Sequence, residues 1–255
     1  MELEGASIIV TGGASGLGEA CIRQFVDRGA TVGILDLDEN RGEKISAELG
    51  NRALYCQTDV VDAASVRSAL EKVIDTFGAL HGVINCAGVG TPMKVLGKKG
   101  PIPIDLFNRV IQINLIGTMN VLSQAAAMMT SNSPNADGEK GVIINTASAA
   151  AFEGQIGQAA YSASKAGVVG MTLPIAREFA DYGIRVMTIA PGLFETPMLA
   201  GLPSPIREAL AKSVPFPVRL GRPEEFASLA SHIIENPYLN GETIRLDAAL
   251  RMAAK

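Results

Sequence analysis

Short apolar runs alternate with helical patterns along the whole chain. The runs that read as strands lie at residues 7–12, 31–36, 53–59, 82–88, 141–148, 184–192 and 242–248. Helical spacing of apolar residues, as in Leu17, Cys21 and Phe25, occupies the segments between them. We expect these helices at about 17–29, 39–49, 63–78, 104–129, 159–181 and 224–235.

Strands that are apolar throughout and alternate with helices are typical of a parallel sheet covered on both faces. The pattern therefore predicts the α/β class, with one doubly wound Rossmann-type domain around a seven-stranded, mainly parallel sheet. No linker, shift in composition or internal repeat divides the 255 residues. We expect a single domain that spans residues 1–255.

Charge, hydropathy and the cysteine and histidine content argue against several classes of protein. The net charge of -4 argues against a nucleic-acid surface, and no apolar run reaches the ~18 residues of a membrane span. The start "MELEGASIIVTGG" shows neither a secretory signal nor a transit peptide, so we expect a cytoplasmic protein, or a mitochondrial matrix protein in a eukaryote. Cys21, Cys56 and Cys86 fit no zinc spacing, and two histidines supply neither a Ser-His-Asp triad nor a metal site.

The turn after the first strand is rich in glycine, "VTGGASGLGEA". Gly12, Gly16 and Gly18 follow the spacing G-x-x-x-G-x-G, which differs from the commoner G-x-G-x-x-G. Glycines allow a tight turn and let the backbone approach a pyrophosphate at a helix N-terminus. Such turns also occur without a cofactor, but the place between a strand and a helix favours dinucleotide binding.

Asp36 ends the second predicted strand, where an acid would bond the hydroxyls of an adenosine ribose. A carboxylate here repels a 2′-phosphate, and the neighbours Ser15 and Leu37 supply no positive charge. The sequence therefore predicts NAD rather than NADP. The alternative is a solvated aspartate at a strand end.

Tyr161 and Lys165 lie four residues apart in "AAYSASKAGVVG", on one face of a predicted helix. A free phenol titrates near pH 10, which is too high for a good base at neutral pH. An ammonium nearby favours the phenolate, so we expect Lys165 to lower the pKa of Tyr161. By itself the spacing could also be an incidental surface pair.

The chain resembles the short-chain dehydrogenase/reductase family over essentially its whole length. The residues that carry the resemblance are "TGGASGLG", "NCAG" (85–88), Asn114 in "INLIGT", Ser148 in "NTAS", "YSASK" (161–165) and "PG" (191–192). Longer stretches around Tyr161 (141–178) and at 183–199 look like the subfamily of type 2 3-hydroxyacyl-CoA dehydrogenases, also called 17β-hydroxysteroid dehydrogenases type 10. The resemblance implies NAD-dependent oxidation of (S)-3-hydroxyacyl-CoA esters in fatty acid metabolism, with side activity on steroids.

The same resemblance implies the roles of four catalytic residues. Tyr161 would be the general acid/base, and Lys165 would also bond the nicotinamide ribose. Ser148 would donate a hydrogen bond to the substrate oxygen, and Asn114 would hold a water that relays protons from Lys165 to solvent. Taken singly, Ser148 and Asn114 could equally be capping or loop residues.

The cofactor positions follow residue by residue from the family motifs. Those implied are Gly12, Ser15, Gly16, Leu17, Gly18, Asp36, Leu37, Asp59, Val60, Asn85, Cys86, Ala87, Gly88, Tyr161, Lys165, Pro191, Gly192, Phe194 and Thr196. Asp59 and Val60 would hold the adenine, and the residues from Pro191 to Thr196 would close over the nicotinamide. Cys86 stands where many family members carry asparagine.

The substrate contacts are less well defined. The apolar segment 193–217 is expected to be a lid that suits an acyl chain or a steroid, unless it packs on a neighbouring subunit. Ser148, Tyr161 and Gln155 are the predicted substrate contacts. Lys94, Lys98 and Lys99 in the segment 94–103 could bind the phosphates of coenzyme A, or merely solubilise a loop.

The family is usually tetrameric, so we expect a homotetramer without nucleic-acid or membrane partners. The C-terminal "IRLDAALRM" departs from the family pattern of aspartate followed by two glycines. The alternatives are a 3-oxoacyl-carrier-protein reductase, which normally uses NADPH, and a steroid or secondary-alcohol dehydrogenase. A catalytically idle NAD-binding scaffold is the alternative from another class.

Overall fold

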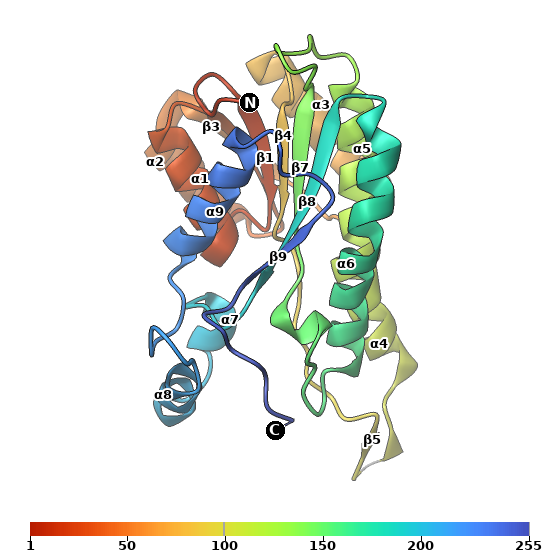
Figure 1. The fold of residues 1–255 in the computed structure, drawn as a ribbon, viewed down its shortest axis with the longest axis vertical. Coiled ribbons are helices and arrows are strands. Elements are labelled where there is room, and N and C mark those ends of the chain that lie inside the picture. The colour runs from red at the N-terminus through yellow and green to blue at the C-terminus, as the bar shows by residue number, and fades with distance from the viewer. Residues whose placement is uncertain (99, 255) are drawn as a thin grey trace.

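The computed structural model describes residues 1–98 and 100–254 (Figure 1). In this part of the chain one parallel seven-stranded sheet has the order β3-β2-β1-β4-β7-β8-β9. Its strands are β1 (Ser7–Thr11), β2 (Thr31–Asp36), β3 (Ala53–Gln57), β4 (Gly82–Asn85), β7 (Gly141–Thr146), β8 (Ile184–Pro191) and β9 (Thr243–Leu246). The predicted fold class is confirmed, and each predicted strand is present.

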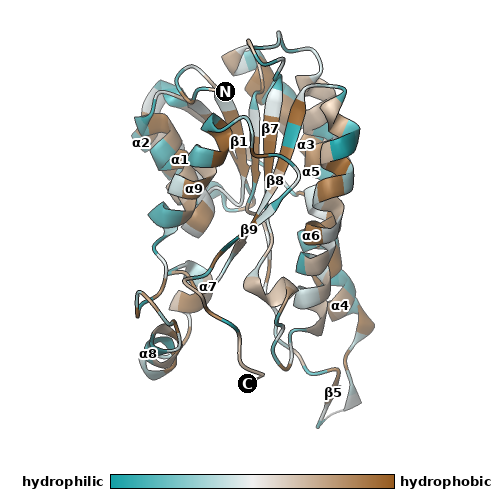
Figure 2. Cartoon of the chain, in the orientation of Figure 1, coloured by the Kyte–Doolittle hydropathy of each residue, from teal (hydrophilic) through white to brown (hydrophobic). Residues whose placement is uncertain are grey.

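Helices cover both faces of the sheet. On one face lie α1 (Gly16–Asp27), α2 (Glu39–Leu49) and α9 (Pro223–Glu235), and on the other α3 (Ala63–Phe77), α4 (Ile104–Ile111), α5 (Thr118–Met129) and α6 (Ala159–Ala180) (Figure 1). Two apolar cores fill the space between the layers. Figure 2 shows the apolar residues of the strands between the two sets of helices. Because both faces are buried, the strands are apolar at every position instead of at alternate ones.

The segment predicted as one helix over 104–129 is interrupted. A π-helical turn, Gln112–Gly117, separates α4 from α5 and contains the buried Asn114. Such turns are rare and often occur at functional sites. The hydrophobic pattern could not predict this turn, because the chain keeps its helical direction through it.

Several short elements were not predicted. A hairpin of β5 (Leu96–Gly97) and β6 (Gly100–Pro101) precedes α4. The predicted lid contains α7 (Pro197–Ala200) and α8 (Ser204–Lys212). Elements this short carry too few residues to show a period. Within the described ranges no helix is long and apolar enough to cross a membrane.

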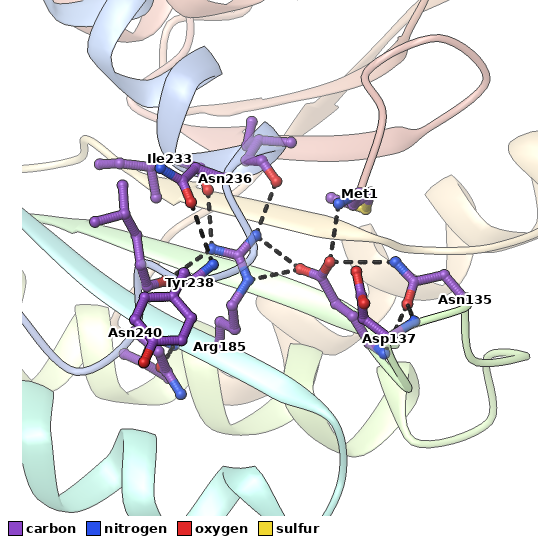
Figure 3. A network of polar contacts seen from close by, with 12 residues as sticks. Met1, Asn135, Asp137, Arg185, Ile233, Asn236, Tyr238 and Asn240 are labelled. Carbon is purple, nitrogen blue, oxygen red and sulfur yellow. Dashed lines mark hydrogen bonds and ion pairs between the residues drawn. The ribbon is translucent and has the colours of Figure 1, made fainter.

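A buried ion pair between Arg185 and Glu139 lies at the amino ends of the strands, and hydrogen bonds from Arg185 join it to α9 (Figure 3). The Arg185 Nε donates to Glu139 Oε1 at 2.8 Å, and its two Nη atoms donate to the carbonyls of Ile233 and Ile234. These carbonyls belong to the last turn of α9, where a cation is favourable. The contacts lie at the edge of the sheet opposite the carboxyl ends of the strands.

Candidate active site

The glycine-rich turn lies between β1 and the first turn of α1. Gly12 and Gly16 have positive φ angles of 64° and 56°, which favour glycine. A methyl group on Gly12 would lie 2.8 Å from the backbone nitrogen of Ala87. The N-cap of α1 is Ser15, whose side chain makes no capping bond. The first N–H groups of the helix can therefore serve an anion such as a pyrophosphate. Leu17 and Gly18 belong to the same turn of helix.

Asp36 is at the carboxyl end of β2 beside this turn. Its Oδ2 accepts from the Ala14 N–H and its Oδ1 from the Asp38 N–H, both at 3.0 Å. The adjacent Leu37 is 64% exposed. The carboxylate is thus held beside the glycine turn, in the position that suits a ribose hydroxyl, while the leucine is free to cover a flat ring.

Asp59 and Val60 follow β3 at the same edge of the sheet. The exposed Asp59 accepts at Oδ1 from the Val61 N–H at 3.0 Å. Val60 is buried, and its carbonyl accepts from Asn120 Nδ2 at 2.8 Å. The structure therefore brings the predicted adenine contacts to the edge that carries Asp36.

The residues after β4 line the other side of the glycine turn. Asn85 donates from Nδ2 to Asn145 Oδ1 at 3.0 Å across the sheet, and the Ala87 N–H donates to Thr11 Oγ1 at 3.1 Å. A methyl group on Gly88 would lie 3.5 Å from Lys165 Nζ. Cys86 lies between them, with its Sγ 3.5 Å from Thr146 Oγ1. The predicted segment 85–88 thus connects the phosphate cradle to the lysine.

Tyr161 and Lys165 lie on one face of α6, as their spacing predicts. The Lys165 Nζ lies 5.9 Å from the centroid of the Tyr161 ring. It donates to the carbonyl of Thr146, the last residue of β7, at 2.7 Å. The lysine is almost fully buried, and this burial lowers its pKa to about 8, although the nearby Cys86 acts in the opposite direction.

The expected effect of Lys165 on Tyr161 is not seen. Burial raises the pKa of the phenol, and a hydrogen bond with Ser148 opposes this rise. The prediction of a lowered pKa is therefore wrong for this arrangement. The physical reason is that the ammonium is directed at the Thr146 carbonyl and not at the phenol oxygen.

Ser148 follows β7 and caps a short 3-10 turn, Ala149–Ala151. Its Oγ accepts from the Ala150 N–H at 3.1 Å, so its own proton can be donated elsewhere. The Ser148 hydroxyl lies within hydrogen-bond reach of the Tyr161 phenol. It can therefore donate a hydrogen bond to a ligand oxygen that exchanges a proton with the phenol.

Asn114 is completely buried in the π-helical turn. Its Oδ1 accepts from the Val89 N–H at 2.8 Å, and its Nδ2 donates to the Val89 carbonyl at 2.9 Å and to Ser164 Oγ at 3.1 Å. The side chain therefore fixes the segment after β4 against α6, beside Lys165. The sequence did not indicate this clamp, and the water relay stays a prediction.

The lid crosses the site from the glycine turn toward Tyr161. A methyl group on Gly16 would lie 3.3 Å from Pro197 Cδ, and a methyl group on Gly90 would lie 3.3 Å from Met198 Sδ. Of the predicted cofactor residues, Thr196 lies beside Gly16, whereas Pro191 ends β8 and Gly192 lies against Asp247. Phe194 differs, because its ring packs edge-on against Phe226 of α9, with the centroids 6.5 Å apart. Its side chain is buried in the core, so the predicted contact of its ring with the cofactor is not supported by this arrangement.

Gln155 and Lys94 lie on two segments that are in contact, since the Met93 N–H donates to the Gly157 carbonyl at 2.7 Å. Gln155 donates from Nε2 to the Ala253 carbonyl at 3.1 Å. Lys94 and Lys98 are exposed around the hairpin, whereas Lys99 lies outside the described residues. Over the described ranges, no group of three His, Cys, Asp or Glu side chains could hold a metal ion.

Four contributors to the site were missed in the sequence. Thr11 supports Ala87 and Ser164 supports Asn114; both lie inside motifs that were recognised, "TGGASGLG" and "YSASK", but neither was given a role. Thr146 and Val89 act through backbone atoms, which any residue type could supply. Only Thr11 and Ser164 act through their side chains, so only these two could have been predicted from residue type.

Comparisons with known proteins agree on one family. The family model described as short chain dehydrogenase matches residues 6–206. The chain is 53% identical to 3-hydroxyacyl-CoA dehydrogenase type-2 of Drosophila melanogaster, across 98% of this chain and 99% of the relative. The crystal structure of 3-hydroxyacyl-CoA dehydrogenase type-2 from Mycobacterium avium is similar, with a TM-score of 0.95, 42% identity and 98% coverage of both chains. The 3-ketoacyl-(acyl-carrier-protein) reductase from Brucella melitensis complexed with NADH has a TM-score of 0.88 at 28% identity, covering 98% of this chain and all of the other.

Proposed function

We propose that this chain, which belongs to the short-chain dehydrogenase family, interconverts (S)-3-hydroxyacyl-CoA and 3-oxoacyl-CoA with NAD as its cofactor. Membership makes it an oxidoreductase that acts on a small molecule with a nicotinamide cofactor. The observation that carries the proposal is the cluster of Ser148, Tyr161 and Lys165 beside the glycine turn. The names of the similar proteins support the acyl-CoA substrate.

NAD, held by the glycine turn and Asp36, would supply the hydride chemistry at the substrate's C3, as acceptor in the oxidation and, as NADH, as donor in the reduction. In the oxidation the Tyr161 oxygen takes the hydroxyl proton, and in the reduction it returns a proton to the carbonyl oxygen. The Ser148 hydroxyl donates a hydrogen bond to the same oxygen and orients it. Lys165 is held by the Thr146 carbonyl, with its Nζ 5.9 Å from the centroid of the Tyr161 ring, and can donate its other N–H groups to the nicotinamide ribose.

Two features favour NAD over NADP. The Asp36 carboxylate lies beside the glycine turn and can accept hydrogen bonds from both ribose hydroxyls. A 2′-phosphate on the same ribose would bring two negative charges together, which is unfavourable. Leu37 beside it is apolar and exposed, so it can cover the adenine but cannot pair with a phosphate.

The lid and the hairpin region support an acyl-CoA substrate. Met198 covers Gly90 near Tyr161 with an apolar side chain, which suits an acyl chain. Lys94 and Lys98 are exposed in the hairpin region and are suited to the phosphates of coenzyme A. We also propose a homotetramer, as is usual for the family.

The proposal is tested by following NADH consumption with acetoacetyl-CoA for the wild type and Tyr161→Phe, with NADPH in parallel. We expect NADH-dependent turnover that falls by about 10²–10⁴ in the variant, the usual contribution of a general acid/base. NADH binding, measured by its fluorescence, should be unchanged. A preference for NADPH would indicate a carrier-protein reductase instead. NADH binding without turnover of acetoacetyl-CoA would contradict the proposed substrate and require a steroid panel.

A further inference from the structure

Arg245 on β9 connects three segments of the chain through its guanidinium group. Its Nη1 and Nη2 donate to the two carboxylate oxygens of Glu153, each at 2.7 Å. Its Nε donates to Asp247 Oδ2 at 2.7 Å, and Nη2 also donates to the Leu250 carbonyl at 3.2 Å. Paired, parallel bonds of this kind fix direction as well as distance.

The first segment that Arg245 holds begins at the catalytic Ser148. Ser148 caps the 3-10 turn Ala149–Ala151, and Phe152 and Glu153 follow directly. The guanidinium carbon lies 5.0 Å from the centroid of the Phe152 ring. The arginine therefore contacts this segment twice, by the ion pair with Glu153 and by a cation–π interaction with Phe152. A displacement of Glu153 would be passed along this short segment to Ser148.

The second and third segments are the C-terminal turn and the tail after it. Ala248 and Ala249 have positive φ angles of 52° and 63°, a strained conformation for alanine. Asp247 stabilises this turn by accepting from the Ala249 N–H at 3.1 Å, and Arg245 holds Asp247. Strained backbone persists only where surrounding contacts fix it. Here Arg245 holds Asp247 at 2.7 Å, and the exposed Arg251 adds a longer bond to the same oxygen, Asp247 Oδ2, at 3.2 Å.

The tail then returns to the segment that follows Ser148. The Ile156 N–H donates to the Ala254 carbonyl at 3.0 Å, and Gln155 donates to the Ala253 carbonyl at 3.1 Å. Figure 1 shows the tail passing below the carboxyl edge of the sheet, between α7 and α8 on one side and α6 on the other. On the lid side, Asp247 and Ala248 border an apolar cavity of about 240 Å³ with Phe194 and Val214.

We propose that Arg245 is a positioning residue for substrate binding. Its bidentate bond to Glu153 joins the segment 148–156 and the tail 247–254 into one wall of the substrate cleft, between the lid and Tyr161. The role rests on the proposed dehydrogenase function for its kinetic effect, but the ordering of the wall does not depend on which substrate is turned over.

The test compares Arg245→Met and Arg245→Lys with the control Arg23→Met. Arg23 also pairs with two carboxylates, those of Glu19 and Glu48, but lies on α1. In Arg245→Met we expect KM for acetoacetyl-CoA to rise about tenfold or more, with a smaller change in kcat and an unchanged Kd for NADH. The KM of Arg245→Lys should lie between those of the wild type and Arg245→Met, because lysine restores the charge but not the paired hydrogen bonds. Arg23→Met should have the same KM, kcat and Kd for NADH as the wild type.

Hydrogen exchange tests the same wall without any substrate. The Ile156 amide bonds to the tail, so its exchange should accelerate at least about tenfold in Arg245→Met and stay unchanged in the control. If the wild type does not turn over acetoacetyl-CoA, the proposed function fails and this exchange result alone decides the role of Arg245. Unchanged exchange, or an equal loss of NADH and substrate affinity, would overturn the role. Should Arg245→Met fail to fold, Glu153→Gln takes its place, with the same expected directions.

Discussion

The Asp36 carboxylate accepts a hydrogen bond from the backbone N–H of Ala14 at 3.0 Å. The bond joins the end of β2 to the glycine-rich turn after β1, two segments that both have to contact a dinucleotide. Because the turn itself holds the acid, the two groups that we propose for the ribose and for the pyrophosphate are fixed relative to one another. Cofactor choice should therefore depend on this one carboxylate.

Asp36→Asn is expected to weaken the preference for NADH. The amide keeps an acceptor for Ala14 but removes the charge that bonds the ribose and repels a 2′-phosphate. Hydrogen bonds to charged groups contribute about 1.5–3 kcal/mol, so kcat/KM for NADH should fall about 10- to 100-fold, while kcat/KM for NADPH rises. The measurement is initial rates with both cofactors.

Asp38→Asn provides the matched control for this prediction. Asp38 is exposed two residues away and caps α2 by accepting from the Arg41 N–H at 3.1 Å. Asparagine is an equally good cap, so cofactor preference and stability should stay as in the wild type. An identical change in both variants would show that net charge, and not the placement of Asp36, sets the preference.

The stability of the protein should depend on pH through Lys165. Burial lowers the pKa of Lys165 to about 8, from 10.5. Below about pH 8 the lysine is charged in the folded and in the unfolded protein. Burying this charge then costs the folded protein about 3 kcal/mol of stability. Between about pH 8 and 10 the unfolded chain binds more protons at this site, so the cost disappears as pH rises.

Lys165→Met removes this contribution. We expect the stability of the variant relative to the wild type to fall by up to about 3 kcal/mol from about pH 7 to about pH 10. Urea unfolding at several pH values measures the difference, in which the titration of all other groups cancels. A difference that does not change with pH would show that the pKa of Lys165 is not lowered.

The buried pair at the other edge of the sheet should contribute to stability and not to catalysis. Arg185 and Glu139 are 6% and 8% exposed (Figure 3). Arg185→Met leaves a buried carboxylate without its guanidinium and should cost about 3–5 kcal/mol in the free energy of unfolding. Denaturant unfolding measures this cost, and kcat per folded molecule should not change.

Arg28→Met is the control for that experiment, because Arg28 pairs with Glu235 on the surface between α1 and α9. Exposed pairs contribute about 0–1 kcal/mol, so this variant should unfold almost as the wild type does. Equal losses in the two variants would mean that burial does not strengthen the Arg185 pair.

The lysines of the hairpin region should act on coenzyme A alone. The double substitution Lys94→Ala and Lys98→Ala is expected to raise KM for acetoacetyl-CoA about fivefold, since each exposed ion pair contributes less than about 1 kcal/mol. KM for a steroid alcohol, which carries no phosphate, should stay constant. If both values of KM rise together, the lysines do not bind the phosphates.

Much of the fold could be predicted because its signals are local. The buried strands show as apolar runs, and the glycine turn must contain Gly12 and Gly16 because of its positive φ angles. The spacing of Tyr161 and Lys165 places both on one side of any regular helix. Each of these features depends on residues within about one turn or one strand of each other, so the sequence by itself determined them.

The tertiary structure decided the rest, since burial and partners come from distant parts of the chain. Lys165 has a lowered pKa and faces Thr146 because β7, 19 residues earlier, packs against α6. Asn114 holds Val89 only because α4 and α5 are joined by a π-helical turn. Arg245 reaches Glu153, 92 residues away, because the sheet brings β9 beside the segment that follows β7. No local pattern records such contacts, since each requires the packed layers to be in place.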